Sequence, residues 1–198
     1  MPKVNGRERS SRIVDISSLI ITNFDFSAQT ISDNSFSTTA ITGWTYQLNS
    51  DAPSNPVLAR GTSAFGNPGI SSPSNSYISS YQTRVTQCQY WLNQLANSGD
   101  VGSLYQTITI PSNYSQIRLY IDASGRRSPN PFSSNHFVEV YLNSVERISC
   151  VPLVSDNNRY ASAWFTPPSG AVELRLRTRL TSTVDSTLFV HGIRMEGY

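Results

Sequence analysis

Few residues of this chain have the types and spacing that catalysis requires. Neither histidine, His136 or His191, belongs to a metal-ligand motif such as H-x-H or H-E-x-x-H, and the 32 serines include no G-x-S-x-G nucleophile elbow. Glu139 and Glu173 would be the carboxylate pair of a glycosidase, but each alternates with Arg or Tyr, where cross-strand salt bridges are the ordinary role. We expect a protein that is not an enzyme and that needs no metal and no cofactor.

Aromatic side chains are the second set of candidate binding residues, because Trp and Tyr rings stack on the apolar faces of sugars. Trp44 and Trp164 lie within strand-like patterns and are expected in the core. Trp91 gives no clear signal of either burial or contact. The candidate glycan-binding residues are Tyr77, Tyr81, Tyr90, Trp91 and Tyr160.

Arginines and aromatic residues recur at alternate positions of several predicted strands. The residues with this outward parity that we assign to partner binding are Arg118, Tyr120, Tyr141, Arg175, Arg177 and Arg179. If their strands are neighbours, these side chains form one face, and Arg and aromatic residues are enriched in protein interfaces. The alternative is an ordinary solvent-exposed face of mixed charge.

The N-terminal residues form a basic segment. Lys3, Arg7, Arg9 and Arg12, against Glu8, give it a net charge of +3, whereas residues 13–198 carry 11 basic and 12 acidic groups. Residues 1–12 show no hydrophobic periodicity, so we predict an extended arm that binds a partner. Four cations without interleaved aromatic residues are a weak nucleic-acid signal, and an acidic neighbouring subunit is at least as good a partner.

Composition limits the class of protein. The 198 residues have a net charge of +2, with 14 Arg and one Lys, and only 14% are charged, which argues against a charge-driven disordered chain. No apolar run approaches the roughly 20 residues of a membrane span, and no signal-peptide pattern is present. Without an export signal, Cys88 and Cys150 are expected to be free buried thiols rather than a disulfide.

Short alternating runs separated by turn residues indicate antiparallel strands with one buried face. We predict an all-β, two-sheet antiparallel jelly-roll sandwich, with an extended basic arm at 1–19 and the domain at 20–198, which includes a long Ser/Pro/Asn-rich loop at about 50–80. Residues 88–95 are ambiguous between strand and helix. The other strand-like runs are 16–26, 41–46, 104–110, 117–122, 137–142, 161–165, 172–180 and 188–195.

Several of these runs resemble the galactose-binding-like jelly rolls, which include many carbohydrate-binding modules. The resemblance is carried by Asn23-Phe24-Asp25-Phe26, Gly43-Trp44 and the strand Leu104–Pro111, and by the later runs Phe137–Asn143, Trp164–Phe165 and Phe189–Glu196. It covers about residues 20–196 and implies a fold more than a function. The last strand departs from the family pattern, because it reads Val190-His191-Gly192-Ile193.

Three functional hypotheses follow. The leading one is a non-enzymatic structural protein of a large assembly that resembles, in architecture only, the cement or decoration proteins of tailed-phage capsids. It would be part of the virion, assembled in the host cytoplasm, bind capsid subunits and favour a trimer. In that case, deleting residues 1–20 should leave a folded body that no longer joins particles. The alternative is a carbohydrate-binding module or host-adsorption protein that binds glycans through loop aromatics. A glycan-active hydrolase is the third.

Overall fold

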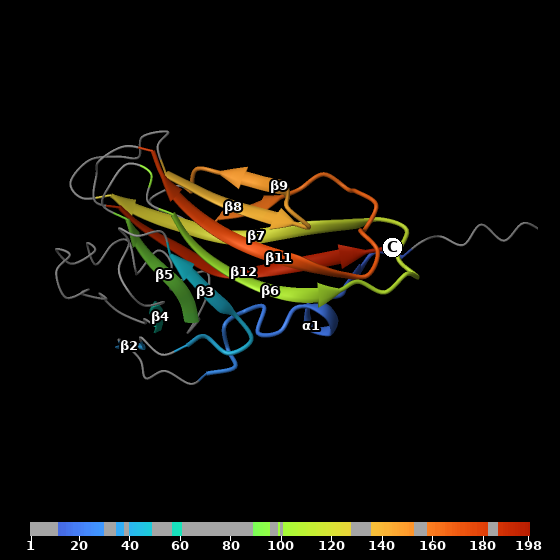
Figure 1. Cartoon of the computed structure of the whole chain (residues 1–198), viewed down its shortest axis with the longest axis horizontal. Coiled ribbons are helices and arrows are strands. Elements are labelled where there is room, and N and C mark those ends of the chain that lie inside the picture. Colours follow the sequence, from blue (N-terminus) through green and yellow to red (C-terminus); the bar gives the residue numbers. More distant parts are fainter. Residues whose placement is uncertain are drawn as a thin grey trace, which may run out of the picture.

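The strands form two antiparallel sheets packed face to face, so the predicted all-β jelly-roll sandwich is confirmed (Figure 1). The structure is a computed structural model that describes residues 12–29, 35–37, 40–48, 57–60, 89–95, 99, 101–127, 136–152, 158–181 and 186–198. The elements are β1 (Val14–Asp15), α1 (Ser17–Ile20), β2 (Ser35–Ser37), β3 (Thr45–Leu48), β4 (Val57–Arg60), β5 (Gln89–Leu95), β6 (Val101–Thr109), β7 (Ile117–Arg127), β8 (His136–Leu142), β9 (Val145–Cys150), β10 (Asn158–Ala161), β11 (Ala171–Leu180) and β12 (Ser186–Gly197).

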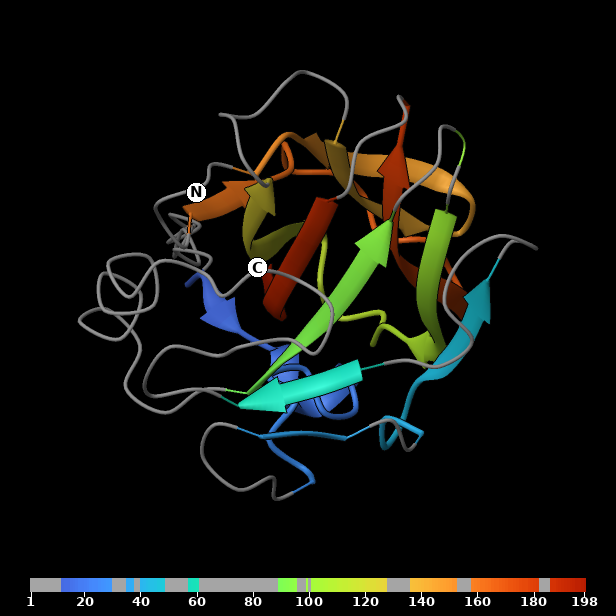
Figure 2. The same cartoon turned by 90° about the vertical axis from the view of Figure 1, so that its left-hand side faces the viewer.

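The two sheets differ in size and in the strands at their centres. The seven-stranded sheet has the order β10-β7-β12-β5-β4-β2, and β1 also pairs with β12. The five-stranded sheet has the order β3-β6-β11-β8-β9. Figure 2 shows the layers end on, with β4 beside β5. Within the described residues, no helix is long and apolar enough to cross a membrane.

Alternation along the strands builds the core, as the sequence predicts. The inward residues of β7, β8 and β11 are almost completely inaccessible: Ile117, Leu119, Ile121, Val138, Val140, Leu142, Val172, Leu174 and Leu176. Their neighbours in each strand point outward and carry the Arg, Tyr and Glu side chains. Because side chains of a strand alternate between faces, one buried face fixes the opposite face as a row of polar groups.

The N-terminal part of the body begins earlier than predicted. Residues 14–19 were expected in the extended arm, but β1 pairs with the end of β12, and the Ile16 N–H donates to the Met195 carbonyl over 2.9 Å. Ile16 and Ile21 are buried in the core, and the Ser17 hydroxyl accepts from the Met195 N–H over 2.8 Å. Residues 14–19 therefore belong to the folded body, and the run 16–26 is a short helix followed by turns rather than a strand.

Other local predictions have mixed outcomes. The ambiguous run 88–95 contains strand β5, and β4 lies inside the predicted loop at 50–80. β9 was not predicted. Val140 of β8 pairs with Ile148 and Tyr141 pairs with Glu146, so Arg147 is an extra residue that interrupts the alternation of β9. Trp44 is buried as expected, but Trp164 is only partly buried and lies outside the hydrophobic core. Cys150 is a free buried thiol, and Cys88 lies outside the described residues.

Candidate functional site

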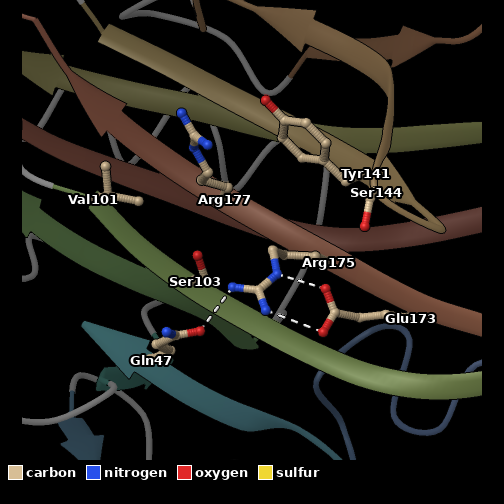
Figure 3. A pocket seen from close by; sticks show the side chains of 8 residues that line it. All are labelled: Gln47, Val101, Ser103, Tyr141, Ser144, Glu173, Arg175 and Arg177. Atoms are coloured by element: carbon tan, nitrogen blue, oxygen red, sulfur yellow. Dashed lines mark hydrogen bonds and ion pairs between the residues drawn. The ribbon is translucent and has the colours of Figure 1, made fainter. Parts of the chain in front are cut away.

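A pocket with several polar and charged side chains in its lining opens on the outer face of the five-stranded sheet (Figure 3). Its volume is about 570 Å³, which lies within the range of about 300–1,000 Å³ usual for small-ligand sites. Strands β3, β6 and β11 supply most of the lining, while β8 and the β8–β9 turn supply one wall. The lining residues are Gln47, Val101, Ser103, Tyr141, Ser144, Glu173, Arg175 and Arg177.

Arg175 lies at the centre of the pocket and is held rigidly. Its Nε and Nη2 donate to the two carboxylate oxygens of Glu173 over 2.7 and 3.1 Å, and its Nη1 donates to the Gln47 amide oxygen over 2.9 Å. The guanidinium also lies over the Tyr105 ring, 4.7 Å from its centroid. Hydrogen bonding to Arg175 lowers the pKa of Glu173, so this pair stays ionised at neutral pH. The central group is therefore positioned before any ligand arrives.

A buried carboxylate supports the next part of the same face. Glu139 is only 1% exposed, and its two oxygens lie 2.8 Å from the Arg177 Nε and 2.9 Å from the Arg179 Nη2. Arg179 also packs over the Phe137 ring at 4.3 Å. One carboxylate thus fixes two guanidinium groups, which explains why a charged side chain is tolerated at a buried position.

Tyr141 forms the aromatic wall of the pocket. Burial, followed by the charge of Glu139, raises the pKa of Tyr141 to about 12, so its hydroxyl stays protonated. That hydroxyl lies 3.0 Å from a Glu146 carboxylate oxygen and 3.3 Å from a Glu139 oxygen. Arg177 lies over the Tyr141 ring, 5.4 Å from its centroid. The ring is therefore oriented at its hydroxyl end, and its position beside the pocket suits contact with an apolar ligand face.

The predicted partner-binding face is divided between the two sheets, which corrects the expectation that it is one surface. Arg118 and Tyr120 are on β7, in the seven-stranded sheet, whereas the other four predicted residues are on β8 and β11. Outer faces of a sandwich point in opposite directions, so the two groups cannot contact one partner surface together. The sequence pattern showed which face each side chain takes within its strand, but not which sheet each strand joins.

On the opposite face, Arg118 and Tyr120 form a separate network. Both side chains bond Glu196, over 3.0 and 2.6 Å, and Arg118 lies 4.7 Å from the ring centroids of both Tyr120 and Trp164. Arg159 binds Asp122 through two hydrogen bonds of 2.8 and 2.9 Å. These side chains mainly hydrogen-bond to one another, as expected if the outer face of β7 is an ordinary solvent-exposed face of mixed charge.

The remaining candidate residues do not meet at the pocket. Arg12 is exposed, and Lys3, Arg7, Arg9, Tyr77 and Tyr81 lie outside the described residues. Tyr90 and Trp91 are placed on β5 of the other sheet, and only their backbone is described. Tyr160 packs against the core, with its hydroxyl 3.4 Å from the Val151 carbonyl. Sequence reasoning missed Gln47, Val101, Ser103 and Ser144, because only the strand order brings them beside β11.

The residues on which the family resemblance rests stabilise the fold and do not line the pocket. The Gln106 side chain accepts from the Thr22 N–H over 2.9 Å and donates to the Thr22 carbonyl over 3.1 Å. The Asn23 side chain donates to the Thr42 carbonyl and accepts from the Ala28 N–H. The Trp44 Nε1–H donates to the Asn23 carbonyl over 3.2 Å. These bonds tie the 22–28 turns to β6 and to the segment before β3.

The described residues contain no cluster of three or more His, Cys, Asp or Glu side chains that could hold a metal ion. The two carboxylates considered as a glycosidase pair, Glu139 and Glu173, are both bonded to arginines. Both histidines are buried, and burial lowers the pKa of His191 to about 3, so it is neutral at physiological pH. His191 lies at an irregularity of β12, between Val190 and Gly192, and stacks on Phe189.

No protein-family model and no curated protein matches this sequence. Among solved structures, the chain is similar to TmCBM61 in complex with β-1,4-galactotriose, with 10% identity, a TM-score of 0.44, and coverage of 78% of this chain and 88% of that one. It is also similar to the enzymatically active domain of bacteriophage CBA120 tailspike protein 4, with 12% identity, a TM-score of 0.47, and coverage of 80% and 20%. A third is CBM51 from Clostridium perfringens GH95 in complex with methyl-galactose, with 12% identity, a TM-score of 0.35, and coverage of 92% and 99%. These likenesses are too distant to assign a ligand.

Proposed function

We propose that this protein is a non-enzymatic carbohydrate-binding module whose site is the pocket on the five-stranded sheet. The observation that carries the proposal is the prearranged group Glu173–Arg175–Gln47 beside the Tyr141 ring. It places hydrogen-bond donors and acceptors within one concave site of about 570 Å³.

The chemistry of the lining suits a sugar. A sugar hydroxyl donates one hydrogen bond and accepts others, so it is matched by adjacent carboxylate, amide, guanidinium and hydroxyl groups. Glu173, Arg175 and Gln47 supply the first three, and Ser103 and Ser144 supply hydroxyls. The C–H faces of a pyranose ring are apolar and pack on an aromatic ring, which Tyr141 offers at the wall. Arg175, Glu173 and Gln47 bond one another, and their remaining N–H groups and lone pairs would be desolvated without compensation by a purely apolar ligand.

The bonding of the carboxylates supports a binding role rather than hydrolysis. A glycosidase needs one carboxyl group that is protonated and another that is free to act as base or nucleophile. Glu173 shares both of its oxygens with Arg175, and its lowered pKa opposes protonation. Glu139 is bound by two arginines and is only 1% exposed.

A glycan array followed by calorimetry with the best-bound glycan tests this proposal. Arg175→Ala should abolish binding, because it removes the central donor and releases Glu173 and Gln47. The matched control is Arg194→Ala, since Arg194 is also a partly exposed arginine on a strand but belongs to β12 of the other sheet. It should bind as the wild type does. An array without reproducible hits, or equal binding by both variants, would contradict the proposal.

The assembly subunit is the second candidate, and one observation favours it. Three apolar side chains near the start of the described residues are exposed: Ile13 is 52% exposed, Val14 36% and Leu19 77%. Exposed apolar side chains beside basic residues are a reasonable contact for a protein partner. In this proposal the arm would bind a capsid shell, the protein would be part of a virion, and a trimer would multiply weak contacts. Co-sedimentation with particles tests it, and loss of co-sedimentation on Leu19→Ser is the expected result.

A further inference from the structure

We propose that the pocket prefers acidic saccharides, and that Arg177 binds a sugar carboxylate at one end of the site. This inference rests on the proposed function, since it concerns the ligand class of the same pocket. The observation behind it is a guanidinium group that lines the pocket without a carboxylate of its own.

The ionised groups that line the pocket do not balance. They comprise one carboxylate, Glu173, and two guanidinium groups, Arg175 and Arg177. Glu173 is fully engaged by Arg175 through both oxygens. Arg177 depends on Glu139, which is shared with Arg179. One carboxylate thus serves two guanidinium groups, and among the side chains that line the pocket itself the unbalanced positive charge lies at the Arg177 end. Glu146, which the Tyr141 hydroxyl reaches, does not line the pocket.

Arg177 also has hydrogen-bond donors to offer a ligand. Within the described residues, the only ion pair of Arg177 joins its Nε to Glu139. The N–H of Nε does not point at the Glu139 oxygen, so this contact is an ion pair without a hydrogen bond. Its two terminal nitrogens make no hydrogen bond to any part of the chain that the structure describes. The side chain is 32% exposed, and the Tyr141 ring beside it limits its motion. A planar guanidinium with free terminal donors matches a carboxylate through two parallel hydrogen bonds.

The site is therefore polarised along β11. Glu173 and Arg177 lie on either side of Arg175, and their backbones are about 13 Å apart at the usual rise of a strand (Figure 3). A carboxylate near Glu173 would be repelled, whereas one near Arg177 would be attracted. We therefore expect an acidic saccharide to bind in one direction, with its carboxylate at Arg177 and its neutral hydroxyls at Gln47, Arg175 and Glu173.

A glycan array with matched sets tests the preference, each set holding a neutral glycan, its uronate counterpart and its sulfated counterpart. The expected result is that uronates bind about tenfold more tightly than their neutral partners, as a charge-assisted bond predicts. Equal binding of neutral and uronate members would overturn this inference and leave the proposed function intact. Preference for sulfated members alone would overturn the carboxylate assignment. An array without hits would overturn both proposals.

Two variants locate the effect. Arg177→Gln should lower the ratio of uronate to neutral affinity from about ten toward one, because it removes the terminal donors that pair with the sugar carboxylate. Arg194→Gln, on the opposite face, is the matched control and should retain the full preference. If Arg177→Gln keeps the tenfold preference while circular dichroism shows a folded protein, the assignment to Arg177 is wrong. Raising the salt concentration should weaken uronate binding to wild type far more than neutral binding.

Discussion

His191 makes this fold sensitive to mild acid. Burial lowers the pKa of His191 from 6.5 to about 3, so between these values the unfolded chain takes up a proton that the folded protein does not. The contribution of His191 to stability is constant above pH 6.5, and it is lost by up to about 1.4 kcal/mol per pH unit as the pH falls toward 3. Urea unfolding at about pH 6.5 and 5 should show this loss in the wild type, and His191→Gln should reduce it. An equal loss of stability in the wild type and in His191→Gln would show that protonation of His191 is not the cause.

Gly43 is a residue whose replacement should be costly. Its φ is +80°, and an added Cβ would lie 2.5 Å from the Thr22 Cγ2. Gly43→Ala should therefore lower the free energy of unfolding by about 1–2 kcal/mol, through backbone strain and the clash together. Gly170→Ala is the matched control: its φ is +77° but no atom lies within 4 Å of the added Cβ, so it reports the strain alone. Equal losses would show that the Thr22 contact contributes nothing.

At the scale of elements, β1 and α1 set how far the N-terminus can be shortened. Removing residues 1–11 should leave the free energy of unfolding within about 0.5 kcal/mol of the full chain, because Ile16 and Ser17 keep their bonds to β12. Removing residues 1–20 deletes β1 and the buried Ile16, and should cost about 2–5 kcal/mol or more. Denaturant titration of both truncations measures this. The shorter truncation is therefore the one that can test partner binding, and a stable 21–198 fragment would refute this account of the N-terminal elements.

The strands were predictable wherever one face is buried and the other polar. Val172, Leu174 and Leu176 alternate with charged residues without interruption, so periodicity alone defined β11. β9 breaks that alternation at a register shift, and residues 16–26 form turns in which apolar side chains are buried without a strand period. The pocket was not predictable, because it depends on β3 and β6 lying on one side of β11 and β8 on the other. Strand order is a property of long-range pairing that no local pattern contains.

At the scale of the whole molecule, ligand binding should appear as added stability. A ligand that binds only the folded state at about 100 times its Kd raises the free energy of unfolding by about 2.7 kcal/mol. For a chain of 198 residues this corresponds to a rise in Tm of roughly 5–10 °C. Thermal unfolding with the best array glycan should show the rise in wild type and in Arg194→Ala, but not in Arg175→Ala. A rise that persists in Arg175→Ala would place the ligand elsewhere.

The position of β12 has a consequence for how the chain acquires its structure during synthesis. β12 is the last strand in sequence, yet it lies inside the seven-stranded sheet, between β7 and β5, and also pairs with β1. While residues 186–197 are still within the ribosome, β7 and β5 have no strand between them and expose edges that invite pairing with other chains. The seven-stranded sheet therefore cannot close between β7 and β5 until residues 186–197 have left the ribosome, so the early-made strands wait for the late-made one.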